Sequence, residues 1–163
     1  MGEKDKKTYF TDNYFHTLDD RGRVSIPAEF RETLEKRTKG KVVLMMDGDK
    51  CIVVFPYDAW EKETGARIKP HLPSDPRVDQ SEIDFRRWAM SSSKITELDS
   101  HGRLLIPPSH RQKVGINKEV AIIGAGFAFE IWDKEKWQKE LNEIEKRRNS
   151  SKIGEKNEKP ENG

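Results

Sequence analysis

The chain contains the stretch Leu18-Asp19-Asp20-Arg21-Gly22-Arg23-Val24-Ser25-Ile26-Pro27 and, 80 residues later, a near copy, Leu98-Asp99-Ser100-His101-Gly102-Arg103-Leu104-Leu105-Ile106-Pro107. From Leu18 to Leu34, 7 of 17 positions are identical in the two copies, and the identity reaches Arg31 and Arg111 beyond the quoted stretches. Similarity at one constant offset indicates an internal repeat. Because a solenoid needs at least three repeats to bury a continuous core, two copies predict a duplicated unit instead.

A second block of similarity follows at an offset of 77 residues. Val54-Phe55 and Trp60 match Ile131-Trp132 and Trp137. The change of offset indicates three additional residues in the first copy, within the charged stretch 35–41.

Both copies predict the same order of elements. A short strand leads into a turn at Asp-x-x-Gly-Arg, and a second strand ends at a proline that suits the first turn of a helix. Two further strands are joined by a glycine-containing turn, and a helix closes the unit. The expected strands cover 23–26, 42–46 and 51–55 in the first copy and 103–106, 120–123 and 127–132 in the second.

These elements predict an α+β chain with five segments. The first unit is expected at 9–64 and the second unit at 93–144. Between them, residues 65–92 are expected to form a connector that prolines interrupt and that contains a helix near 78–90. Residues 1–8 and the Lys-, Glu- and Asn-rich residues 145–163 are expected to be disordered, because such compositions bury too little apolar surface.

The composition excludes several classes of protein. Charged residues make up 37% of the chain, and no apolar run approaches the roughly 18 residues of a membrane span. Cys51 is the single cysteine, so a disulfide framework within the chain is excluded, and the charged N-terminus does not resemble a secretory signal. A cytoplasmic protein is therefore expected. The net charge of +2 does not by itself indicate a nucleic-acid partner.

The Asp-x-x-Gly-Arg turns support two interpretations. In the simpler one each is a hairpin turn, structured by Asp19 and Gly22 or by Asp99 and Gly102, with the arginine in solvent. In the other, a two-stranded ribbon enters the major groove of DNA and an arginine bonds guanine O6 and N7. The candidate DNA-binding residues are Arg21, Arg23, His101 and Arg103. A mostly neutral His101 makes the second turn the weaker candidate.

Other residues have competing interpretations as well. Arg31 and Arg111 lie four residues after a proline, where they could contact phosphate or pack on apolar surface. The four tryptophans are expected in the core or between subunits rather than as stacking platforms for bases.

No catalytic or metal site is expected. The four histidines are scattered and form no i, i+4 pair, and Cys51 lies in an apolar strand. Gly124-Ala125-Gly126 lies between two strands and therefore predicts a turn, not a dinucleotide loop. No cofactor and no small-molecule substrate are expected.

From Phe10 to Leu141 the sequence resembles the MraZ family of bacterial regulators, within the AbrB-like swapped-hairpin superfamily. The resemblance rests on the two Leu-Asp-x-x-Gly-Arg stretches, together with Val54-Phe55-Pro56-Tyr57-Asp58-Ala59-Trp60 and Phe129-Glu130-Ile131-Trp132-Asp133-Lys134-Glu135-Lys136-Trp137.

The resemblance implies both a fold and a function. The fold would be a pseudo-two-fold β-barrel built from both units, surrounded by helices, with subunits assembled in a closed ring. The protein would act at the nucleoid and bind direct repeats in promoter DNA upstream of the division and cell-wall gene cluster, repressing its own operon. The alternative from another class is a non-catalytic protein-interaction or antitoxin-like oligomeric module.

Overall fold

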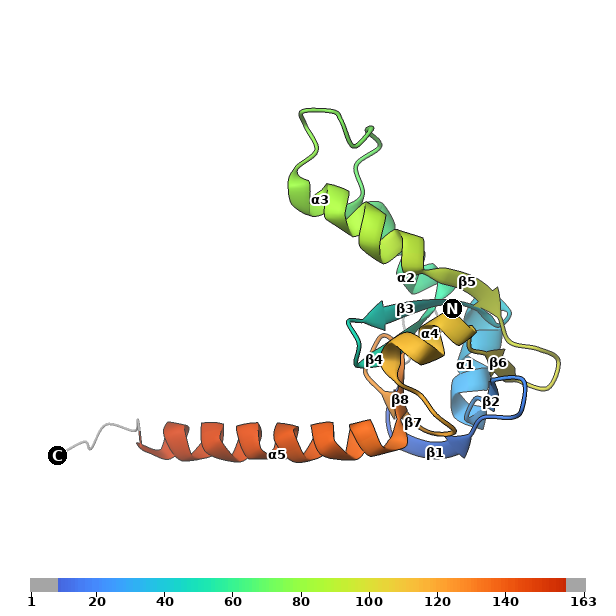
Figure 1. Ribbon diagram of the computed structural model, residues 1–163, viewed down its shortest axis with the longest axis vertical. Coiled ribbons are helices and arrows are strands. Elements are labelled where there is room, and N and C mark those ends of the chain that lie inside the picture. Colours follow the sequence, from blue (N-terminus) through green and yellow to red (C-terminus); the bar gives the residue numbers. More distant parts are fainter. Residues whose placement is uncertain (1–8, 158–163) are drawn as a thin grey trace, which may run out of the picture.

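The computed structural model describes residues 9–157 and confirms an α+β chain made of two similar units (Figure 1). The first unit contains β1 (Asn13–Thr17), β2 (Arg23–Ser25), α1 (Ala28–Thr38), β3 (Lys41–Asp47), β4 (Cys51–Pro56) and α2 (Tyr57–Arg67). The second contains β5 (Lys94–Glu97), β6 (Arg103–Leu105), α4 (Pro108–Val114), β7 (Glu119–Gly124), β8 (Phe129–Asp133) and α5 (Lys134–Asn157). Helix α1 is four residues longer than α4, which places the additional residues of the first copy at its C-terminal end.

The two units exchange strands. The larger sheet has the order β1-β7-β8-β4-β3-β5, and β2 pairs with β6 in a separate antiparallel ribbon. Strands β1 and β5 each pair with a strand of the other unit, β7 and β3, and β4 pairs with β8. The simple hairpin interpretation of the Asp-x-x-Gly-Arg turns is therefore wrong, because the strands on either side of each turn pair with the other unit and not with each other.

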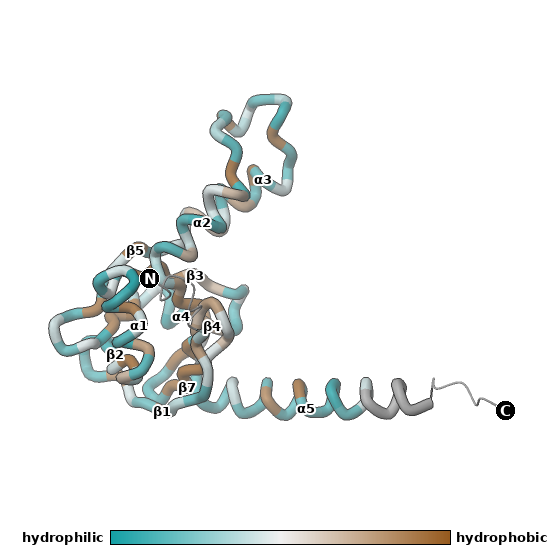
Figure 2. The backbone as a smooth tube through the Cα atoms, turned by 180° about the vertical axis from the view of Figure 1, so that it is seen from behind, coloured by the Kyte–Doolittle hydropathy of each residue, from teal (hydrophilic) through white to brown (hydrophobic). Residues whose placement is uncertain are grey.

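The core is shared between the units for the same reason. Val24 of β2 and Leu104 of β6 are paired in register and both fully buried. Below them Phe30 of α1 packs against Phe129 of β8, with ring centroids 5.0 Å apart. Figure 2 shows hydrophobic positions gathered in the strands, whereas α5 is mostly hydrophilic. Each unit thus buries its apolar strands against the other, and the two form one body.

The connector forms a helical arm that projects from this body (Figure 1). The helix expected near 78–90 is present as α3 (Gln80–Asp84), which continues as the π-helical segment η1 (Phe85–Met90). Asp79 caps it by accepting a hydrogen bond from the Glu82 amide at 2.9 Å. The Arg67 guanidinium lies 3.8 Å from the centre of the Phe85 ring, which joins α2 to the returning helix.

Residues 145–157, part of the tail that the sequence predicts to be disordered, continue α5 as helix. Trp137 anchors the start of this helix on Trp132, with ring centroids 5.4 Å apart. Propagation from an anchored helix costs little, since glutamate, lysine and arginine are good helix formers. Arg147 also pairs with Glu140 at 3.1 Å. Residues 1–8 and 158–163, also expected to be disordered, lie outside the described residues.

Two adjacent leucines test whether side chains along β6 alternate between the core and the surface. We expect Leu104→Ala to lower the free energy of unfolding by about 2–5 kcal/mol, because truncation of a fully buried side chain leaves a cavity. Leu105→Ala is the matched control, since Leu105 is 52% exposed, and its effect should stay within about 0.5 kcal/mol. Denaturant unfolding of the two variants measures the difference, and equal losses would contradict this arrangement of the strand.

Candidate nucleic-acid interface

Asp19 organises the first turn. Its Oδ1 accepts hydrogen bonds from the backbone amides of Arg21 and Arg23, both at 2.9 Å, and its Oδ2 accepts one from Arg23 Nε at 2.7 Å. The backbone amide of Arg23 is the main cause that holds the pKa of Asp19 below its ordinary value. The carboxylate is thus ionised, and it binds the turn and the arginine together.

Asp99 repeats this arrangement in the second turn. Its Oδ1 accepts from the amides of His101 and Arg103 at 2.9 Å, and its Oδ2 accepts from Arg103 Nε at 2.9 Å. The amide of Arg103 is again the main cause of a lowered carboxyl pKa. The structure therefore gives all four expected turn-structuring residues a geometric role, since Gly22 and Gly102 supply the positive φ angles of +79° and +73°.

The aspartates orient the arginines without using their terminal nitrogens. Within the described residues, Arg23 and Arg103 bond an acceptor through Nε, and their Nη atoms form no hydrogen bond. The side chains are 27% and 30% exposed. Each guanidinium is therefore held in place with its outer edge free for a planar acceptor such as guanine or phosphate.

The β2–β6 ribbon brings both arginines to one surface. Arg23 is paired with Leu105, Val24 with Leu104, and Ser25 with Arg103. Because the central pair is buried, the residues on either side of it point outward. Arg23 and Arg103 thus lie at opposite ends of one exposed ribbon, and Arg21 and His101 lie exposed on the turns beside them.

Arg31 and Arg111 pack against the turns of the opposite unit. A Cβ added at Gly22 would lie 2.8 Å from the guanidinium carbon of Arg111, and one at Gly102 would overlap the side chain of Arg31. Neither arginine forms an ion pair with a described residue, and Arg111 Nε is buried without a hydrogen-bond partner there. Their geometry supports the packing interpretation, and phosphate contact stays a prediction. The spacing of residues within one copy does not predict that each arginine packs on the turn of the other unit.

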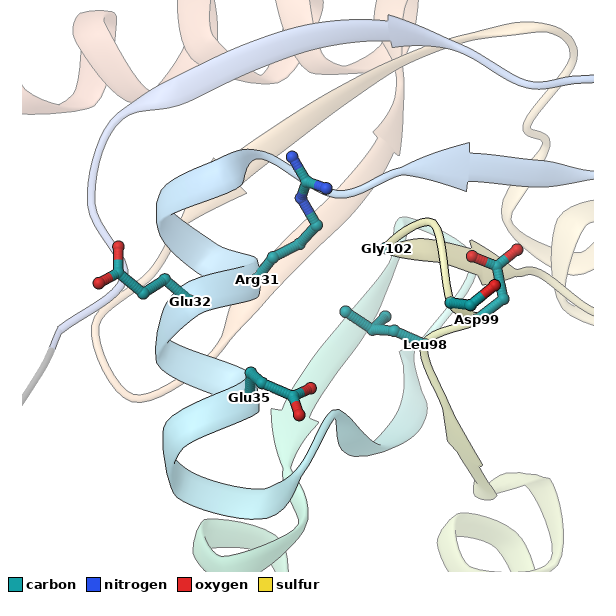
Figure 3. Close-up of a pocket in the computed structure, with 7 residues that line it drawn as sticks. Arg31, Glu32, Glu35, Leu98, Asp99 and Gly102 are labelled. Carbon is teal, nitrogen blue, oxygen red and sulfur yellow. The ribbon is translucent and has the colours of Figure 1, made fainter.

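A shallow cleft of about 290 Å³ separates α1 from the second turn (Figure 3). In that view Glu35 extends from α1 toward Leu98, whereas the guanidinium of Arg31 points away from Leu98 and Asp99. The first turn is bordered by α4 through Arg111, and α4 also contains Lys113 and no carboxylate. The two ends of the ribbon therefore differ in their electrostatic surroundings.

Cys51, considered above as a nucleophile, lies in the core. Cys51 is buried, and burial raises the pKa of its thiol, which keeps it protonated. Within residues 9–157, no group of three or more His, Cys, Asp or Glu side chains could hold a metal ion. In the same range no helix is long and apolar enough to cross a membrane. Trp132 is buried, as expected of a core residue, whereas Trp88 on the arm is 59% exposed.

Sequence comparisons match both units. The family described as "MraZ protein, putative antitoxin-like" matches residues 9–67 and 90–158. A protein of Thioalkalivibrio sulfidiphilus named "Transcriptional regulator MraZ" is 35% identical over 126 residues, which is 77% of this chain and 81% of the relative. A protein of the same name from Moorella thermoacetica is 36% identical over 135 residues, or 82% of this chain and 87% of the relative.

The contact between Arg111 and Gly22 can be separated from backbone strain. We expect Gly22→Ala to lower the free energy of unfolding by about 2–4 kcal/mol, because a left-handed alanine costs about 1–2 kcal/mol and the new Cβ also displaces the guanidinium. Gly48→Ala is the control, since Gly48 has φ of +56° with no atom near its Cβ position, and should lose only the strain. Thermal unfolding compares the two, and equal losses would show that the Arg111 contact does not constrain the turn.

Proposed function

The chain belongs to the MraZ family, and from this membership we propose that it is a sequence-specific DNA-binding transcription regulator. The observation that carries the proposal is the pair of aspartate-held arginines, Arg23 and Arg103, on one exposed two-stranded ribbon. The relatives' name, "Transcriptional regulator MraZ", supports the same function.

The ribbon has dimensions and chemistry that suit the major groove. A two-stranded antiparallel ribbon fits this groove, where guanine presents O6 and N7 to an arginine fork. Arg23 would make that bidentate contact with the Nη atoms that Asp19 leaves free. Arg21, exposed on the turn, would neutralise a neighbouring phosphate. Asp19 faces inward to the turn amides, so its charge is directed away from the DNA.

Assembly would compensate for the small net charge of the chain. We propose that the two units close a barrel and that subunits form a closed ring, which repeats the ribbon around its rim. Direct repeats in promoter DNA would then bind several ribbons at once, and the linked contacts would multiply a weak single affinity. Each phosphate contact adds about 0.9 to the logarithmic salt slope, so binding would be steeply salt-dependent.

The proposed target is the promoter of the protein's own operon in the division and cell-wall gene cluster, bound as a repressor at the nucleoid. The alternative is a protein-interaction or antitoxin-like module. It is favoured by Trp88, which is 59% exposed on the projecting arm, and by the exposed Tyr9–Phe127 pair with ring centroids 5.6 Å apart.

We expect Arg23→Ala to weaken binding to the DNA upstream of the protein's own gene by about 10- to 100-fold, the discrimination of one bidentate arginine–guanine contact. Fluorescence anisotropy at near-physiological salt, with excess shuffled competitor, measures it. Arg103→Ala should weaken binding less, because its turn has His101 where the first has Arg21.

Arg77→Ala is the charge-matched control, because Arg77 is 67% exposed on the connector and remote in the fold from the ribbon. It should leave the affinity for DNA unchanged. All three variants should form oligomers with the same number of subunits as the unaltered protein. An Arg23→Ala protein that binds as tightly as the Arg77→Ala protein would contradict the role of Arg23 in DNA binding. Equal binding of native and shuffled DNA by the unaltered protein would favour the interaction module.

A further inference from the structure

The outer face of the ribbon contains two cross-strand pairs of residues, and the two pairs are not equivalent. Each pair contains one arginine and its cross-strand partner, which is Leu105 beside Arg23 and Ser25 beside Arg103. Residues directly opposite each other on an antiparallel pair point to the same face, with Cβ atoms about 4.5–5.5 Å apart. The pseudo-symmetric positions 25 and 105 therefore hold a polar residue at one end of the ribbon and an apolar residue at the other.

Leu105 needs an apolar partner that lies next to an arginine acceptor. Its side chain is 52% exposed, whereas Leu104 next to it is fully buried, so the core of the described chain does not use it. In the major groove the thymine C5-methyl is the apolar group, and it lies in the same groove edge as guanine O6 and N7. A ribbon that presents arginine and leucine side by side thus matches a guanine next to a thymine.

The charges beside the two turns also favour DNA binding at the Arg23 end of the ribbon. Helix α4 places Arg111 against Gly22 and contains Lys113 but no carboxylate. Helix α1 places Glu35 toward the second turn, across the cleft from Asp99, as Figure 3 shows. Glu35 lies in the part of α1 that extends beyond the length of α4, so the second copy has no equivalent carboxylate there. Arg31 packs on Gly102 as Arg111 packs on Gly22, so the α1 carboxylates make the charge beside the second turn less positive than that beside the first. DNA phosphate is therefore attracted more strongly at the Arg23 end than at the Arg103 end.

We propose, resting on the DNA-binding function above, that the ribbon reads DNA with one polarity: Leu105 contacts a thymine methyl beside the guanine held by Arg23, and Glu35 weakens the binding of phosphate at the Arg103 end. Leu105 is then a specificity-determining residue. A ribbon with two equal ends would accept a site in either orientation. One reading end instead defines a direction along the DNA, which suits sites repeated in the same orientation.

The methyl contact is tested with DNA that lacks the methyl group. The fragment upstream of the protein's own gene is prepared with thymine or with deoxyuridine at every thymine position, and both are titrated by fluorescence anisotropy. The unaltered protein should bind the deoxyuridine fragment at least about fourfold more weakly, the effect of one buried methyl group. Leu105→Ser should bind the thymine fragment more weakly and should bind the two fragments equally.

The serine variant has internal controls. Serine occupies the equivalent position 25 of the same ribbon, so it is compatible with this strand, and unfolding measurements verify its stability. Ser25→Ala should keep the thymine preference of the unaltered protein. A Leu105→Ser protein that still prefers thymine would overturn the proposal. If the Leu105→Ser protein formed a smaller oligomer than the unaltered protein, the proposal would also be overturned, because Leu105 would then contact another copy of the chain.

Failure of the proposed function gives a different result. In that case the unaltered protein shows no preference for the native thymine fragment over shuffled thymine DNA. Specific binding with no loss on deoxyuridine DNA would leave the DNA-binding function standing and would overturn the role of Leu105.

The polarity is tested through Glu35. Glu35→Gln should tighten binding and raise the salt slope by about 0.9 for each phosphate newly contacted at the Arg103 end. Glu63→Gln is the matched control, because it removes the same charge from an exposed position on α2, away from the ribbon. Equal effects of the two variants would show that net charge alone acts, and would overturn the role of Glu35 at that end.

Discussion

The pairing of β2 with β6 is the constraint on which the rest of the molecule depends. This short ribbon is closed at both ends by backbone bonds that cross between the units, from the Ile26 amide to the Gly102 carbonyl and from the Ile106 amide to the Gly22 carbonyl. It buries Val24 and Leu104 at the centre of the core and holds the two turns at its ends. If the pairing were lost, both turns and the shared core would be lost with it.

The turns show how a chain of small net charge can present cations in fixed positions. Each aspartate bonds two backbone amides and the Nε of the arginine four residues later. The arginine loses little further freedom when it binds an acceptor, because its orientation is already set. Since exposed charges at a distance are screened, the few oriented guanidinium groups matter more for recognition than the sum of charges over the chain.

The duplication also explains why the two halves can diverge. Once the units share one core, the fully buried positions at its centre stay apolar in both copies, as at Val24 and Leu104. Exposed positions carry no such constraint, and several differ, as in Arg21 against His101 and Ser25 against Leu105. The pseudo-symmetric scaffold therefore positions surface residues that are themselves asymmetric, and any directional property must come from them.

The sequence by itself determined the duplication, the α+β class, the turns and their candidate residues, because these depend on local spacing and on the few residues that a turn accepts. Only the tertiary structure decided which strands pair and which arginine packs on which glycine, since Arg31 meets Gly102 and not the glycine of its own copy. It also decided that residues 145–157 are helical. A short strand contains no local code for its partner, and helix propagation depends on an anchor such as Trp137 on Trp132, which composition does not show.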